Sequence, residues 1–167
     1  MASSLPLSGT VWSRMATRPP ASAARWSPAR LSARKATRRE LAALLARSRF
    51  LRGYGMRLHA VSDAACTLAV PFRRAFERPG GTVNGPVFMA AADCAMWLAI
   101  KRHIGLEHDA VTSELNTAIL NAARRQTVYC TARVLKTGKR IIYGIAECHD
   151  GKGRLFTHHT VTYSRLA

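Results

Sequence analysis

The segment from Pro79 to Ile104, PGGTVNGPVFMAAADCAMWLAIKRHI, constrains the fold more than any other part of the chain. Asn84 is a preferred helix N-cap residue, Pro86 is tolerated in a first helical turn, and Gly105 is typical of a helix end. Between these signals nearly every side chain is apolar, on all sides of a helical projection. The segment therefore predicts a central helix of about 20 residues that is buried all round.

One acid, Asp93, interrupts this apolar helix. Aspartate is rarely buried unless it is paired or functional, and the neighbouring sequence offers no evident partner. The first turn of a helix leaves backbone N–H groups unbonded, so Gly85 offers a hydrogen-bond donor beside the positive end of the helix dipole. A carboxylate and free N–H donors are components of a hydrolytic site. We therefore expect Asp93 to be functional rather than structural.

Length and cysteine spacing limit the class of protein. A chain of 167 residues fits one domain whose core needs neither metal nor disulfide. The sequence has no CxxC pair and its six histidines form no ligand set, so we expect no metal, and nothing in it calls for a cofactor. No segment is long and apolar enough to span a membrane. Free thiols in a reducing compartment are expected at Cys66, Cys94, Cys130 and Cys148.

The net charge of +17 is divided between a tail and a domain. Residues 1–35 hold six basic side chains and no acid among Ser, Ala and Pro, a composition that cannot bury a core alone. We assign residues 1–36 to a basic disordered tail and residues 37–167 to one folded domain. We expect a cytoplasmic protein, with the mitochondrial matrix as the alternative because the tail overlaps presequences in composition. The 20 basic residues that remain, against nine acids, should attract an anionic partner.

The rest of the chain alternates between helix and strand signals. A capping box of Thr37 and Glu40 starts a short helix with the apolar stripe Leu41, Leu44, Leu45 and Phe50. Residues 73–83 are expected to form a loop. Alternating patterns predict strands at residues 56–61, 65–72, 111–120, 127–136, 140–149 and 155–165.

Small residues Gly144, Ala146 and Cys148 share one face of a predicted strand, which leaves room for the central helix to lie across it. This order predicts an α+β fold in which an antiparallel sheet wraps around one helix. It resembles the hotdog fold. The segment NGPVFMAAAD, with Asn84, Gly85, Pro86 and Asp93, resembles the site of hotdog acyl-CoA thioesterases of the phenylacetate-degradation type.

The usual motif of that family is His-Gly-Gly with an Asp nine positions after the His, so Asn and Pro here replace the His and the second Gly. AVTSELNTAILNAAR after the helix resembles the family's next strand, and TGKR its later Gly-Arg turn. The resemblance covers residues 37–165. It implies hydrolysis of an acyl-CoA thioester, with Asp93 as general base or nucleophile and the Gly85 N–H as oxyanion donor.

Asn84 could hold the attacking water or the sulfur region, or could only cap the helix. Thr112 and Glu114 could line the pocket, and Arg124 and Arg125 could take phosphates, with solvated surface as the alternative. Further expected substrate-binding residues, with core packing or solvation as their ordinary alternatives, are Met89, Trp97, Asn116, Lys139 and Arg140.

Gly85 and Asp93 lie about 12 Å apart along one helix, whereas reacting groups must converge within about 3 Å. A two-fold pair with antiparallel central helices solves this, so we expect a homodimer or a dimer of dimers. The partners are then an acyl-CoA and a second copy, with no membrane and no specific nucleic acid. Three alternatives remain: an acyl-CoA sensor without turnover, a hydratase of the same fold, which would need a helix histidine absent before His103, and nucleic-acid binding through the tail.

Overall fold

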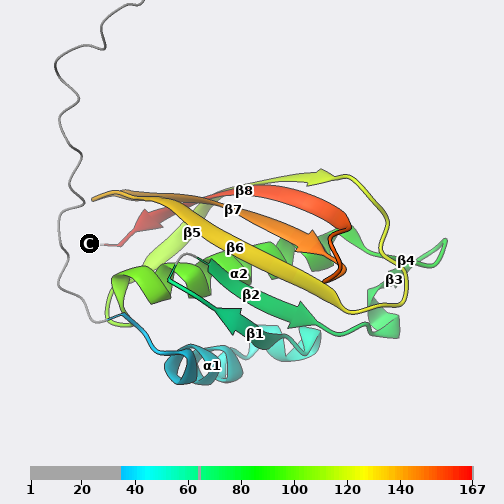
Figure 1. Cartoon of the computed structure of the whole chain (residues 1–167), viewed down its shortest axis with the longest axis horizontal. Helices are drawn as coiled ribbons and strands as arrows, with labels where there is room; N and C mark the ends of the chain where they lie inside the picture. The colour runs from blue at the N-terminus through cyan, green and yellow to red at the C-terminus, as the bar shows by residue number, and fades with distance from the viewer. Residues whose placement is uncertain (1–34, 64, 167) are drawn as a thin grey trace, which may run out of the picture.

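The computed structural model describes residues 35–63 and 65–166 (Figure 1). The predicted tail lies outside the described residues up to position 34. The elements follow in the order α1 (Arg38–Arg47), η1 (Phe50–Tyr54), β1 (Arg57–Val61), β2 (Ala65–Val70), η2 (Arg74–Phe76), β3 (Glu77–Arg78), β4 (Thr82–Val83), α2 (Gly85–Ile104), β5 (Ala110–Ile119), β6 (Val128–Thr137), β7 (Ile141–His149) and β8 (Leu155–Arg165).

The main sheet has six antiparallel strands in the order β1-β2-β6-β7-β8-β5. It curves over α2, and α1 lies beside β1 (Figure 1). The predicted α+β architecture, an antiparallel sheet wrapped around a long central helix, is confirmed. Within the described residues, β5 is an edge strand, and one of its edges has no neighbouring strand.

The inner face of the sheet is shaped to fit the helix. Cys130 and Ala132 on β6 are fully buried, as the alternation predicts. On β7, a Cβ added at Gly144 would overlap the backbone oxygen of Arg133 and would lie 2.5 Å from Met96 Cε of α2, so only glycine fits there. Ala146 and Cys148 are also fully buried on this face. The prediction that small residues on β7 make room for the central helix is confirmed.

The helix α2 runs from Gly85 to Ile104 with Asn84 as N-cap and Gly105 as C-cap, as predicted. It is not buried on every side, however. Met89 is 42% exposed, and Asp93 and Trp97 are only half-buried. These three residues recur at helical spacing and form one stripe along the helix. The prediction of burial all round is therefore wrong for this stripe in a single chain.

Two local predictions before α2 needed correction. Thr37 and Glu40 do form the capping box of α1, and Leu41 and Leu45 are buried. Phe50 instead begins the 3₁₀ helix η1 and is 73% exposed, because α1 ends before it. The predicted loop at residues 73–83 contains η2 and the short hairpin of β3 and β4.

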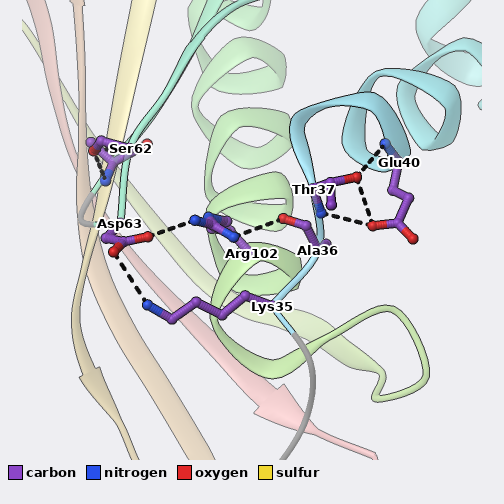
Figure 2. Close-up of polar contacts among 8 residues, drawn as sticks. Lys35, Ala36, Thr37, Glu40, Ser62, Asp63 and Arg102 are labelled. Carbon is purple, nitrogen blue, oxygen red and sulfur yellow. Dashed lines mark hydrogen bonds and ion pairs between the residues drawn. The ribbon is translucent and has the colours of Figure 1, made fainter.

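An ionic contact fixes the start of the described chain against the end of α2 (Figure 2). Arg102 NH2 lies 2.6 Å from Asp63 Oδ1, and Arg102 NH1 donates to Ala36 O at 3.0 Å. Lys35 Nζ lies 3.5 Å from Asp63 Oδ2, and Lys35 and then Arg102 lower the pKa of Asp63. Ala36 is only 2% exposed. Ala36 therefore belongs to the packed structure, just before the expected boundary at residue 37.

Candidate functional site

A cavity of about 320 Å³ lies beside the exposed stripe of α2. Its walls come from the end of α1 and η1, from α2, from the first residues of β5 and from the end of β8. The lining residues are Ser48, Phe50, Leu51, Ala90, Asp93, Cys94, Trp97, Ala110, Val111, Thr112 and Tyr163. Asp93 is the only acid among them, and most of the other side chains are apolar.

Two hydroxyl groups hold the carboxylate of Asp93. Thr112 Oγ1 donates to Asp93 Oδ1 at 2.5 Å, and the Tyr163 hydroxyl lies 2.7 Å from the same oxygen and 2.9 Å from the Asp93 carbonyl oxygen. Oδ2 has no hydrogen-bond partner among the described residues. The expectation that Asp93 lacks a partner is therefore wrong, but both partners are neutral donors. They orient the carboxylate and leave its charge uncompensated.

The two donors come from neighbouring strands. Thr112 on β5 and Tyr163 on β8 are paired in register, so their side chains reach Asp93 from the same face of the sheet. Tyr163 is 3% exposed, and burial, followed by the charge of Asp93, raises the pKa of its hydroxyl well above 10.0. It therefore remains a protonated donor. Sequence reasoning missed Tyr163, although its alternation with Val161 on the inner face of β8 could have indicated it.

Lys101 fixes the connection between α2 and β5, from which Thr112 follows. Its side chain is 5% exposed, and Nζ lies 2.6 Å from Asp109 Oδ1. Nζ also donates to the carbonyl oxygens of Leu106 at 3.2 Å and His108 at 2.6 Å. These three contacts satisfy the ammonium and hold the start of β5 against α2.

The N-terminus of α2 is built differently. Asn84 is exposed and its side chain makes no capping hydrogen bond, while its N–H donates to Phe76 O at 2.8 Å. The Gly85 N–H has no acceptor in the described part of the chain. A Cβ at Gly85 would lie 3.3 Å from Ile119 Cδ1, so the end of β5 passes close to this turn. Gly85 precedes Asp93 by about 12 Å along the helix axis, which places this donor away from the cavity.

The sequence and the structure are similar to those of known proteins. Residues 80–157, which include all of α2, match the family model described as Thioesterase superfamily. A conserved protein from Pseudomonas aeruginosa is 25% identical with a TM-score of 0.70, over 78% of this chain and 100% of that chain. This is the hotdog fold. No curated protein sequence matches significantly.

Two thioesterase structures share the hotdog fold at lower identity. A thioesterase from Haemophilus influenzae is 20% identical with a TM-score of 0.73, over 80% of this chain and 92% of that chain. A mutant thioesterase from Pseudomonas aeruginosa is 19% identical with a TM-score of 0.72, over 80% of this chain and 96% of that chain. At these identities the likeness concerns the fold alone.

The hotdog fold separates the expected substrate-binding residues. Trp97 lines the cavity with Asp93, whereas Met89 lies on the stripe outside the cavity lining. Asn116 Nδ2 donates to Glu114 Oε1 at 2.9 Å on the outer face of the sheet, so neither side chain lines this cavity. Lys139 and Arg140 are exposed on the turn between β6 and β7.

Metal binding, membrane insertion and cysteine chemistry each have their own structural requirements. The described residues contain no group of three or more His, Cys, Asp or Glu side chains that could hold a metal ion. No helix in the described ranges is long and apolar enough to cross a membrane. All four cysteines are free, as predicted, and the structure shows that all four are buried. Burial, with the charge of Asp93, raises the pKa of Cys94 above 9.0, which argues against a nucleophilic thiolate in the cavity.

Proposed function

We propose that the protein is an acyl-CoA thioesterase that works as a homodimer and releases a free acid and coenzyme A. One observation carries the proposal. Asp93 lines a largely apolar cavity, and two hydroxyl groups donate to its Oδ1, whereas no described residue donates to Oδ2. An oriented but uncompensated carboxylate is suited to accept a proton or attack a carbonyl. The match to the Thioesterase superfamily supports thioester hydrolysis in general.

In the general-base route, Asp93 Oδ2 accepts a proton from water as the water oxygen attacks the thioester carbonyl. The resulting oxyanion accepts a hydrogen bond from a Gly85 N–H at the positive end of α2. Collapse of this intermediate breaks the C–S bond, and the thiolate takes up the proton that Asp93 accepted, which restores the carboxylate. If Asp93 attacks directly, an anhydride forms first and water hydrolyses it, with the same products.

The second copy completes the site in this proposal. Asp93 and the Gly85 N–H of one chain are too far apart to meet on one carbonyl carbon. A two-fold pairing with antiparallel α2 helices brings Gly85 of one chain towards Asp93 of the other. Exposed apolar side chains lie on α2 and on the edge strand β5: Met89 is 42% exposed, and Val111 and Ile119 on β5 are 48% and 60% exposed.

The test measures the hydrolysis of acyl-CoA thioesters with short, long and aromatic acyl groups. The free thiol that is released reports the rate. We expect hydrolysis of at least one thioester well above the spontaneous rate. Apolar lining by Phe50, Leu51 and Trp97 favours an apolar acyl group. Tight binding of acyl-CoA without thiol release would instead support a sensor that binds acyl-CoA without hydrolysing it.

A further inference from the structure

Two arginines converge on the turn that precedes α2. Arg124 NH1 donates to Gly80 O at 3.2 Å and lies 3.4 Å from the position of a Cβ at Gly81. Arg125 Nε lies 3.0 Å from Glu77 Oε1 on β3. These two arginines are called the arginine pair below. They come from the connection between β5 and β6, which runs back to the β3–β4 hairpin (Figure 1).

The backbone of the arginine pair is constrained. Arg125 has φ 36°, and it is the one non-glycine residue with positive φ in the described ranges. A non-glycine residue in this region costs free energy and persists where the surroundings fix it. Here the contact with Glu77, whose side chain is 18% exposed, holds the Arg125 guanidinium in place. The chain therefore keeps a strained turn that places two cations side by side.

Most of the donors of the arginine pair are free. The described contacts use Nε of Arg125 and NH1 of Arg124, whereas a guanidinium carries five N–H donors. Among the described residues, Glu77 is the only acid that contacts the arginine pair. Arg74 and Arg78 add positive charge to the segment that holds Glu77. Planar guanidinium forks are the groups that bind phosphate in a bidentate manner.

We propose that the arginine pair binds the nucleotide phosphates of a coenzyme A thioester. The inference rests on the proposed function and names the carrier of the acyl group. Gly85 follows Gly81 by four positions, at most about 14 Å of extended chain, so the arginine pair lies near the proposed oxyanion donor. In coenzyme A the phosphates are separated from the sulfur by the flexible pantetheine arm. A thioester carbonyl at Gly85 can therefore have its phosphates at the arginine pair.

The experiment compares two thioesters with the same acyl group, one on coenzyme A and one on N-acetylcysteamine, which lacks phosphates. In the double variant Arg124→Gln/Arg125→Gln we expect KM for the CoA thioester to rise about 10-fold with little change in kcat, as expected for losing charge-assisted bonds. Turnover of the N-acetylcysteamine thioester should stay within about 2-fold, because a phosphate contact contributes nothing to its binding. For Arg124→Lys/Arg125→Lys, KM for the CoA thioester should lie between the wild-type value and that of the glutamine double variant. Lysine keeps the positive charge but lacks the planar guanidinium that binds phosphate in a bidentate manner.

The control variant is Arg39→Gln/Lys136→Gln, which removes two exposed positive charges that make no described contact. It should leave both thioesters unchanged, and thermal melts should show that every variant is folded. Equal losses with both thioesters, or an unchanged KM for the CoA thioester, would overturn the assignment. If the wild type hydrolyses neither thioester, the proposed function fails, and calorimetric titration with free coenzyme A then decides. Binding that the glutamine pair weakens about 10-fold supports the arginine pair, and unchanged or absent binding refutes it.

Discussion

The first turn and the middle of α2 differ in how much of a site one chain can build. Near Asp93, strands β5 and β8 supply two hydroxyl donors to the same carboxylate oxygen. Near Gly85, the N–H points to no acceptor in the described part of the chain, and Asn84 is exposed without a capping bond. We call the surroundings of Asp93 the carboxylate half of the site and the turn at Asn84 and Gly85 the donor half. One chain supplies every described partner of the carboxylate half, whereas the Gly85 N–H of the donor half has no described acceptor. A donor turn without an acceptor is what a site shared between two copies requires.

The largest expected effect concerns the carboxylate half of the site, at Asp93. Asp93→Asn keeps an oxygen acceptor for Thr112 and Tyr163 but removes the base and nucleophile, so turnover should fall by about 10²-fold or more. Stability should change by less than about 1 kcal/mol because Oδ1 remains bonded. Thiol release and melting temperature on one preparation measure both. Glu107→Gln, which neutralises an exposed acid, is the matched control. Wild-type turnover in a folded Asp93→Asn protein would exclude Asp93 from the chemistry.

Hybrid dimers test whether the two halves belong to different copies. Gly85→Pro removes the donor N–H, and Asn84 with ψ 142° already has the backbone conformation required before proline. Each single variant should be nearly inactive as a homodimer. A hybrid with Asp93→Asn in one copy and Gly85→Pro in the other retains one intact site, so it should recover about half of the wild-type activity.

The measurement uses two affinity tags to isolate the hybrid and compares its turnover with both parents. A site confined to one chain would be damaged in both copies and could not recover. A hybrid as inactive as its parents would therefore remove the shared site from the proposal.

The sequence predicts the donor half better than the carboxylate half, for physical reasons. Asn84, Gly85 and Gly105 act through local backbone rules, so the bounds of α2 could be predicted from neighbouring residues. The bond from Tyr163 to Asp93 joins residues that are 70 positions apart, and only the pairing of β8 with β5 brings Thr112 to the same place. Asn116 could not be assigned for a similar reason. A register irregularity between Thr112 and Glu114 changes which residues of β5 face α2.

Tyr163→Phe should separate orientation of Asp93 from its presence. We expect turnover to fall about 10-fold, because the carboxylate loses one of two donors that hold it. The raised pKa of Tyr163 means that its contribution to stability is complete below pH 10.0 and is lost as pH rises above that value. Denaturant titrations from pH 8 to about 11 should thus show a shallower alkaline loss in Tyr163→Phe.

The control for this prediction is Tyr143→Phe, since Tyr143 is 36% exposed and its hydroxyl makes no described hydrogen bond. It should match the wild type in turnover and in alkaline stability. Identical alkaline curves for Tyr163→Phe and the wild type would show that the hydroxyl is not held as described. Cys66, whose pKa burial raises to about 12, contributes to the alkaline loss in every variant and does not affect the comparison.

Asn84→Ala tests the donor half of the site, and a smaller effect on turnover is expected. Because the Asn84 side chain makes no capping bond, its loss should cost well under about 1 kcal/mol of stability. We expect turnover to fall about 5-fold, if the amide helps to place the water or the thioester. Steady-state kinetics and a thermal melt on the same sample separate the two effects. Unchanged kinetics would leave Asn84 as a helix-start residue with no part in catalysis.

The smallest effect is expected beyond the far end of α2, where the basic tail joins the domain. Deleting residues 1–34 should leave melting temperature and turnover unchanged, because the segment lacks apolar periodicity and supplies no proposed site residue. Deleting residues 1–36 should lower the melting temperature, because it removes the buried Ala36 and its carbonyl contact with Arg102. Neither truncation removes a residue of the carboxylate half or the donor half. Turnover below the melting temperature should therefore equal that of the full chain. A loss of turnover in the shorter deletion would give the tail a role in substrate binding, where salt dependence of KM would be the next measurement.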